Sequence, residues 1–265
     1  MKKNSNFFPW LSLAAGTLCL ILQACLHLFF RDERGLIPRL HPLHLLTLAI
    51  LLAVILFAGL DIYRQDGHNC YKENFPASTL GGITSFLLAG AIGLTLLKKV
   101  LNPSAEVASA LSTLWMVLGL GSIPCLCFTG LCRIRGQRPA FWLHTVLCLY
   151  LALELVTLCL IWNRESQPDV YVPSLLAIIS WMLNTYHHTA FEAGIGRRRM
   201  LLLTGILSGC LCLAALPAVP DKLLFLAGSI WTLTNLCQWE SPKRRRRQGP
   251  AQQEEPQEHE NDISQ

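Results

Sequence analysis

One carboxylate, Glu154, lies inside the long apolar run from Ala140 to Trp162 and is the residue best placed to do chemistry. Tyr150 comes four residues before it and Thr157 three residues after it, so the three side chains share one face of a helix. An ionised carboxylate at mid-helix in a bilayer costs about 3 kcal/mol on insertion scales. The pattern indicates a site that binds a proton or a cationic substrate. The structural alternative is that Glu154 only bonds Tyr150 or a neighbouring helix.

Three polar residues of other segments fall at the depth expected for Glu154. Gln23 and His27 share a face of the first apolar run, at about residues 7–30. His44 lies at the start of the second run, at about residues 43–60, on the same side of the membrane. We expect these three side chains to line an outward-facing polar pocket together with Glu154. The alternative is that His27 and His44 are interfacial residues without a further task. His41 and His44 have ligand-capable spacing but no third ligand, so no metal site is expected there.

A second polar group is expected at the C-terminal end of the sixth apolar run, which begins at about residue 172. Its members are Asn184, His187, His188 and Glu192. Asn184, His188 and Glu192 follow one another every four residues and form a stripe along a helix. Neutral histidine beside a carboxylate can bind a metal or pass protons. The alternative is an interfacial helix end with an ordinary pair between His188 and Glu192. The sequence has neither HExxH nor HxxxH, which disfavours an intramembrane metallohydrolase.

Helices in a bilayer must hold these side chains, because the chain is too apolar for a soluble enzyme. Of its 265 residues, 52% are hydrophobic and 15% are charged, and the mean hydropathy is +0.40. The apolar residues come in long runs, and about 20 such residues cross the hydrocarbon core as a helix. The expected fold class is therefore all-α, a polytopic membrane bundle of eight helices in residues 1–238. The expected helices span about 7–30, 43–60, 79–97, 106–128, 140–162, 172–188, 200–218 and 222–237.

Single residues also mark helix ends and close helix contacts. Pro42 suits the first position of the second helix, and Ser78 is expected to cap the third. Gly205 and Gly209 are spaced to let the seventh helix approach a neighbour closely. Most of the eleven cysteines lie in apolar runs, where we expect reduced packing residues.

The basic residues predict the orientation in the membrane. With eight helices, fifteen of the 22 Lys and Arg residues fall on the side that holds both termini, and seven fall on the other. Cytoplasmic segments are enriched in basic residues, so both termini are expected in the cytoplasm. Residues 239–265 have few large apolar side chains and are expected to form a disordered tail, basic and then acidic. The basic cluster of the tail is expected to attract anionic lipid rather than nucleic acid, and consists of Lys243, Arg244, Arg245, Arg246 and Arg247.

These patterns favour a plasma-membrane transporter of a small molecule or ion, or a permease component, with Glu154 as the binding carboxylate. A membrane sensor or an assembly subunit is the first alternative, and an intramembrane enzyme is the second. The sequence predicts no cofactor and leaves a homo-oligomer or another membrane partner open. A transporter predicts a water-accessible pocket that reaches Glu154, and a scaffold predicts a solid bundle in which Glu154 is tied to one partner. An enzyme predicts histidine and carboxylate groups that converge.

Overall fold

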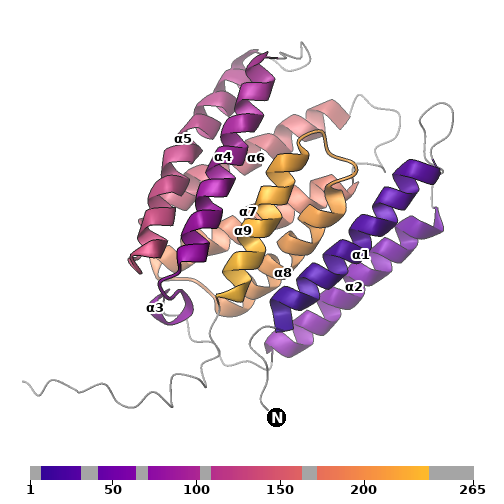
Figure 1. Ribbon diagram of the computed structural model, residues 1–265, viewed down its shortest axis with the longest axis horizontal. Coiled ribbons are helices and arrows are strands. Elements are labelled where there is room, and N and C mark those ends of the chain that lie inside the picture. Colours follow the sequence, from indigo (N-terminus) through magenta and orange to yellow (C-terminus); the bar gives the residue numbers. More distant parts are fainter. Residues whose placement is uncertain (1–6, 31–40, 64–70, 102–108, 163–171, 239–265) are drawn as a thin grey trace, which may run out of the picture.

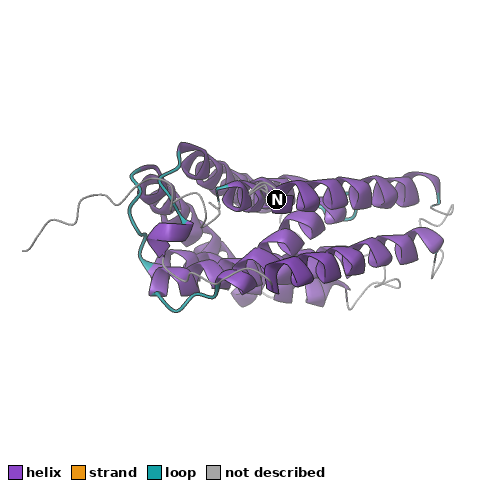
Figure 2. Ribbon diagram, turned by 90° about the horizontal axis from the view of Figure 1, so that it is seen from below, coloured by secondary structure: helices purple, strands orange, loops and turns teal. Residues whose placement is uncertain are grey.

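A computed structural model of the chain describes residues 7–30, 41–63, 71–101, 109–162 and 172–238. Within these ranges the fold is all-helical, with helices joined by short loops and no strand (Figure 2). Six of the described helices are long and apolar enough to cross a membrane. The prediction of a multi-pass helical membrane bundle is therefore confirmed. The predicted tail and its basic cluster lie outside the described residues.

The helices are α1 (Phe7–Phe29), α2 (Pro42–Tyr63), α3 (Tyr71–Asn74), α4 (Thr79–Leu101), α5 (Ser109–Ile134), α6 (Phe141–Trp162), α7 (Val172–Ala193), α8 (Arg198–Ala215) and α9 (Lys222–Cys237). Helices α4 to α9 form a closed ring, because each packs against the next and α9 returns to α4. Helices α1 and α2 pair with each other and pack on the outside of this ring, mainly against α8 (Figure 1). The ring is therefore the part of the fold that can enclose a site.

Glycines allow the closest contacts between helices. A Cβ atom at Gly82 of α4 would lie 2.9 Å from the backbone oxygen of Gly130 on α5, so these two helices meet almost backbone to backbone. On α8, a Cβ atom at Gly209 would lie 2.8 Å from the Ser12 hydroxyl of α1, and one at Gly205 would lie 3.0 Å from a neighbour on α9. The close packing predicted at Gly205 and Gly209 is confirmed.

Several helix ends lie where the sequence placed them. Helix α9 has the predicted bounds, α2 begins at Pro42, and the Ser78 hydroxyl accepts a hydrogen bond of 3.1 Å from the backbone of Gly81 at the start of α4. The predicted ends of α2, α4, α5, α7 and α8 are wrong, by three to six residues. Helix α7 continues to Ala193 and α5 continues to Ile134, because the polar residues there pack inside the bundle instead of leaving it. The single turn α3 was not predicted.

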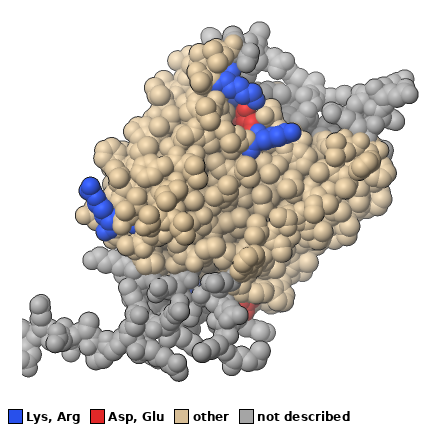
Figure 3. All heavy atoms as spheres, viewed as in Figure 1, with Lys and Arg blue, Asp and Glu red and all other residues tan. Residues whose placement is uncertain are grey.

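The outer surface suits lipid. The face shown in Figure 3 has a broad uncharged band, and its charged side chains gather towards the ends of the helices. On α2, Leu56 is 66% exposed and Phe57 56% exposed, and such apolar side chains recur along the outer helices. Exposure of this kind is unfavourable in water and ordinary in a bilayer. The ten described cysteines are free thiols, as expected.

Candidate functional site

Side chains of two neighbouring helices form an ion pair and a hydrogen bond with Glu154 of α6. Its Oε2 atom lies 3.4 Å from the Nζ atom of Lys99 on α4, and it accepts a hydrogen bond from the indole nitrogen of Trp115 on α5. The Lys99 ammonium also lies 3.7 Å from the centre of the Trp115 ring. The carboxylate is buried, whereas the Lys99 side chain is 36% exposed. Lys99, Trp115 and Glu154, the Glu154 cluster, therefore supply this carboxylate with both a counter-charge and a donor.

The two residues predicted to share a face with Glu154 do not bond it. Tyr150 is fully buried and packs on Trp115 with ring centres 5.6 Å apart, and its hydroxyl has no hydrogen-bond partner among the described residues. The Thr157 hydroxyl donates to the backbone oxygen of Leu153 at 2.9 Å. Glu154 is thus bonded across helices and not along its own.

The structure does not bring Gln23, His27 and His44 to Glu154. Gln23 is buried between α1 and α2, where its Nε2 atom donates to the Thr47 hydroxyl at 3.4 Å. His27 and His44 are partly buried at the adjoining ends of these two helices. Helices α1 and α2 pack on α8 and α9, whereas α6 packs between α5 and α7. The polar residues of the first two helices therefore belong to another part of the bundle than Glu154.

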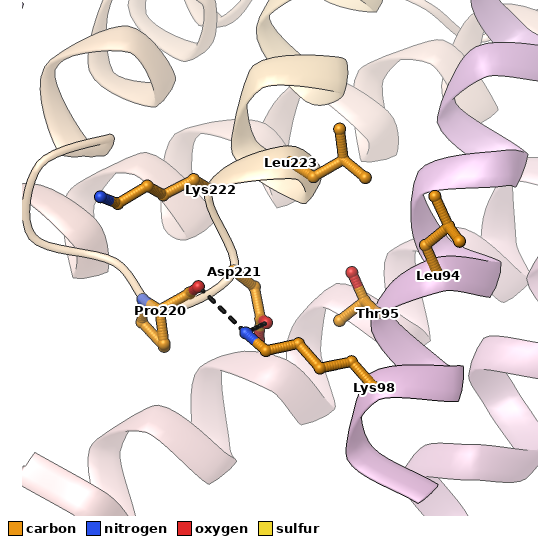
Figure 4. Close-up of a pocket in the computed structure, with 7 residues that line it drawn as sticks. All are labelled: Leu94, Thr95, Lys98, Pro220, Asp221, Lys222 and Leu223. Carbon is orange, nitrogen blue, oxygen red and sulfur yellow. Dashed lines mark hydrogen bonds and ion pairs between the residues drawn. The ribbon is translucent and has the colours of Figure 1, made fainter. Parts of the chain in front are cut away.

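A pocket lies beside the Glu154 cluster, at the same end of the ring. Lys98 of α4 reaches the turn before α9, with Nζ 3.0 Å from Asp221 Oδ1 and 3.2 Å from the backbone oxygen of Pro220 (Figure 4). The pocket has a volume of about 230 Å³ and is lined by Leu94, Thr95, Lys98, Pro220, Asp221, Lys222 and Leu223. Of two consecutive lysines of α4, Lys98 thus contacts the turn before α9, and Lys99 contacts α6.

A second polar cluster lies about 15 Å farther along α6, towards the other end of the ring. Nδ1 of His144 on α6 is 2.7 Å from Oε1 of Glu192 on α7, and both side chains are only 2% exposed. His188 of α7 stacks on His144 with ring centres 5.6 Å apart. Trp231 of α9 packs on both imidazoles, 5.1 Å from His188 and 5.9 Å from His144. Two imidazoles and a carboxylate therefore meet inside the ring.

Arg133 of α5 adds a buried cation to this cluster. Its Nη2 atom donates to Oδ1 of Asn235 on α9 at 2.7 Å, and its guanidinium carbon lies 4.2 Å from the centre of the Phe75 ring. Phe75 in turn packs against His188, with ring centres 5.4 Å apart. Glu192 attracts the Arg133 charge through space. We call the residues that meet here, Arg133, His144, His188, Glu192 and Asn235, the His144 cluster.

The predicted stripe on α7 is divided between the interior and the outside. Asn184, His188 and Glu192 are buried, whereas His187 is only partly buried on another side of the helix. The carboxylate of Glu192 contacts His144 of α6. It does not pair with His188, which lies one turn before Glu192 on α7. Within the described residues, no three His, Cys, Asp or Glu side chains gather in a way that would hold a metal ion.

Sequence reasoning missed Lys99, Trp115, Arg133 and His144. A signal existed for His144, since it is an ionisable residue inside the same apolar run as Glu154, ten residues earlier. Arg133 and Lys99 were counted only as basic residues near helix ends, because a helix end at the membrane surface is where lysine and arginine are ordinary. Nothing near Trp115 in the sequence marks it as the donor to Glu154.

The His144 cluster brings two imidazoles, a carboxylate and a guanidinium together inside the ring. Glu192 and Arg133 carry opposite charges, and low local dielectric makes any change of charge here matter to every group nearby. Imidazole beside a carboxylate is a combination that can pass protons. No protein-family model, curated protein sequence or solved structure matches this chain.

Proposed function

We propose that this chain is a multi-pass transporter of the plasma membrane that moves a small solute together with a proton through the ring α4 to α9. The observation that carries the proposal is the contact between His144 and Glu192. Ionisable side chains inside a membrane bundle are costly, and those that persist commonly serve proton or solute paths. A pair of titratable groups 2.7 Å apart and 2% exposed is such a case.

The proton is assigned to His144 and Glu192 instead of Glu154. Glu154 has a fixed counter-charge in Lys99 and a donor in Trp115. Histidine is the side-chain type suited to binding and releasing a proton near physiological pH, and the His144 cluster contains two histidines. Lysine is not, so the Glu154 cluster has a different role in this proposal.

The Glu154 cluster serves as a latch in this proposal. Its ion pair joins α4 to α6, and the neighbouring pair of Lys98 with Asp221 joins α4 to the turn before α9. These contacts hold one end of the ring together, so solute entry from that end requires that they separate. Alternate opening of the two ends around a fixed interior is the usual scheme of secondary transporters.

The topology proposed for this transporter has eight membrane crossings and both termini in the cytoplasm. Helix α7 falls outside the six apolar spans because of its polar stripe, and α9 because it has 16 residues. Each nevertheless packs between two of the apolar spans, α7 between α6 and α8, and α9 between α8 and α4. The partition of the basic residues supports this orientation, and it puts the His144 cluster on the cytoplasmic side.

A membrane sensor is the second candidate, favoured by the packing inside the ring. Trp181 and Trp231 are almost fully buried, and a Cβ atom at Gly228 of α9 would lie 2.7 Å from the Trp181 ring. A filled interior suits a protein that reports a protonation state to a partner without passing a solute.

Proteoliposomes that contain a pH-sensitive dye test the two candidates. A transporter predicts that an inward gradient of one solute from a panel of lactate, succinate, phosphate, glycine and choline changes the internal pH. The change should be lost in His144→Gln and kept in His187→Gln, a matched control one residue from His188. A pH change of equal size in His144→Gln would contradict the assignment, and a panel that moves no protons would favour the sensor.

A further inference from the structure

Two neighbouring donors of the His144 cluster lack acceptors. The hydrogen bond from Arg133 Nη2 to Asn235 Oδ1 holds the guanidinium and the amide side by side. The other ends of these groups, Nη1 of Arg133 and Nδ2 of Asn235, have no hydrogen-bond partner among the described residues. Arg133 is 5% exposed and Asn235 is 3% exposed, so bulk water does not serve them.

Two buried donors are unfavourable if they have no acceptor. An unpaired buried donor is destabilising, and a charged one is more so. Buried donors in native proteins are therefore nearly always paired with protein, water or a ligand. A guanidinium is also the group whose planar donors best match the oxygens of a carboxylate or a phosphate.

We propose that Arg133 and Asn235 form a binding site for one small oxoanion, a carboxylate or phosphate group whose oxygens accept from Arg133 Nη1 and Asn235 Nδ2. The inference rests on the proposed function in one respect, because it names the class of solute that the ring would carry. The site itself stands on the contacts of these two residues.

The charges around the site favour an anion that binds with a proton. The groups that face it are Arg133 of α5, His144 of α6, His188 and Glu192 of α7, and Tyr71 of α3. Arg138, which follows α5, bonds the backbone oxygen of Glu192. Glu192 turns Oε1 to His144, and its Oε2 atom has no hydrogen-bond partner among the described residues. A proton on His144 would offset the charge of Glu192 and leave that of Arg133 uncompensated. A bound monoanion then restores neutrality in the low dielectric of the interior.

Thermal unfolding and calorimetric titration of the purified full chain in detergent test the site. The probes are lactate, inorganic phosphate and short-chain phosphatidylglycerol, each at pH 6 and pH 8. We expect at least one probe to raise the Tm by about 5 °C at saturating concentration, with tighter binding at pH 6. Arg135→Gln, an exposed arginine at the same helix end, should keep the response, and Arg133→Gln should lose it.

If Arg133→Gln does not fold, Asn235→Asp tests whether Arg133 and Asn235 bind an oxoanion. It places a carboxylate beside the guanidinium, and this internal anion should keep the protein folded while it weakens probe binding at least tenfold. Unchanged binding in Asn235→Asp, or no response of the parent to any probe, would overturn the site. A response to phosphatidylglycerol alone supports an oxoanion site for a lipid headgroup and overturns the solute assignment. Binding of lactate or phosphate without transport supports the site and contradicts the proposed function.

Discussion

Nδ1 of His144 and Oε1 of Glu192 lie 2.7 Å apart and join α6 to α7 inside the ring. The two side chains come from neighbouring helices, so the contact depends on the fold and not on local sequence. A charged imidazole would hold the carboxylate more strongly than a neutral one, because the Coulomb energy is large at this distance in a medium of low dielectric. A charge on His144 would therefore strengthen the contact between these two helices.

Substitution of Glu154 should change stability and leave pH dependence intact. Glu154→Gln keeps an acceptor for Trp115 and loses an ion pair with the partly exposed Lys99, so we expect a loss of about 1 kcal/mol or less. Glu154→Leu leaves the Trp115 donor and the Lys99 ammonium unpaired and should cost about 1–3 kcal/mol. Thermal unfolding in detergent measures both. Loss of proton-coupled uptake in a stable Glu154→Gln protein would return the proton site to Glu154.

Two glycines of α4 should respond differently to the same change. Gly82→Ala puts a methyl group 2.9 Å from the Gly130 backbone oxygen, which cannot move without displacing α5, whereas a Cβ atom at Gly90 meets nothing within 4 Å. We expect Gly82→Ala to cost about 1–3 kcal/mol and Gly90→Ala to cost nothing measurable. The midpoints of thermal unfolding compare them directly. Equal midpoints for the two variants would argue against the close packing of α4 on α5.

Tyr71 should make stability depend on pH at alkaline values. It lies on α3, outside the membrane-spanning helices, and burial raises its pKa from 10.0 to about 12, with Arg133 opposing the rise. The unfolded chain then ionises Tyr71 first, so stability is full below pH 10 and falls as the pH rises through 10 towards 12. Unfolding of the parent and of Tyr71→Phe, followed between pH 8 and pH 11, should show a shallower loss in the variant. Parallel curves would mean that Tyr71 is not buried.

The topology can be tested with single cysteines in an otherwise cysteine-free protein. The partition of basic residues predicts that Gln167→Cys faces outward and Gln257→Cys faces the cytoplasm. An impermeant thiol reagent applied to intact cells should label the first and spare the second. Labelling of Gln257→Cys would contradict the proposed arrangement of eight crossings.

The helices were largely predictable because apolar runs of about 20 residues carry a strong signal. Pro42 and Ser78 even gave the starts of two helices, since each has a local physical role there. The end of α7 was not predictable from its own residues. Glu192 is polar, and only its partner His144 from α6 explains why it stays helical and buried.

The candidate site was only half predictable for the same reason. The sequence marks Glu154 as unusual, but its partners Lys99 and Trp115 come from two other helices, and no local pattern joins them. The stripe on α7 was found by its spacing, whereas Arg133 looked like an ordinary basic residue at a helix end. Periodicity gives the face that a side chain occupies and not the helix that covers it.

Accumulation of solute against its gradient tests the central claim most directly. With one proton per solute and no membrane potential, a gradient of two pH units should concentrate the solute up to about 100-fold in proteoliposomes of the parent. His144→Gln should allow the solute only to equilibrate, and His187→Gln should accumulate it like the parent. Accumulation by His144→Gln to the level of the parent would show that the pair of His144 with Glu192 does not carry the proton.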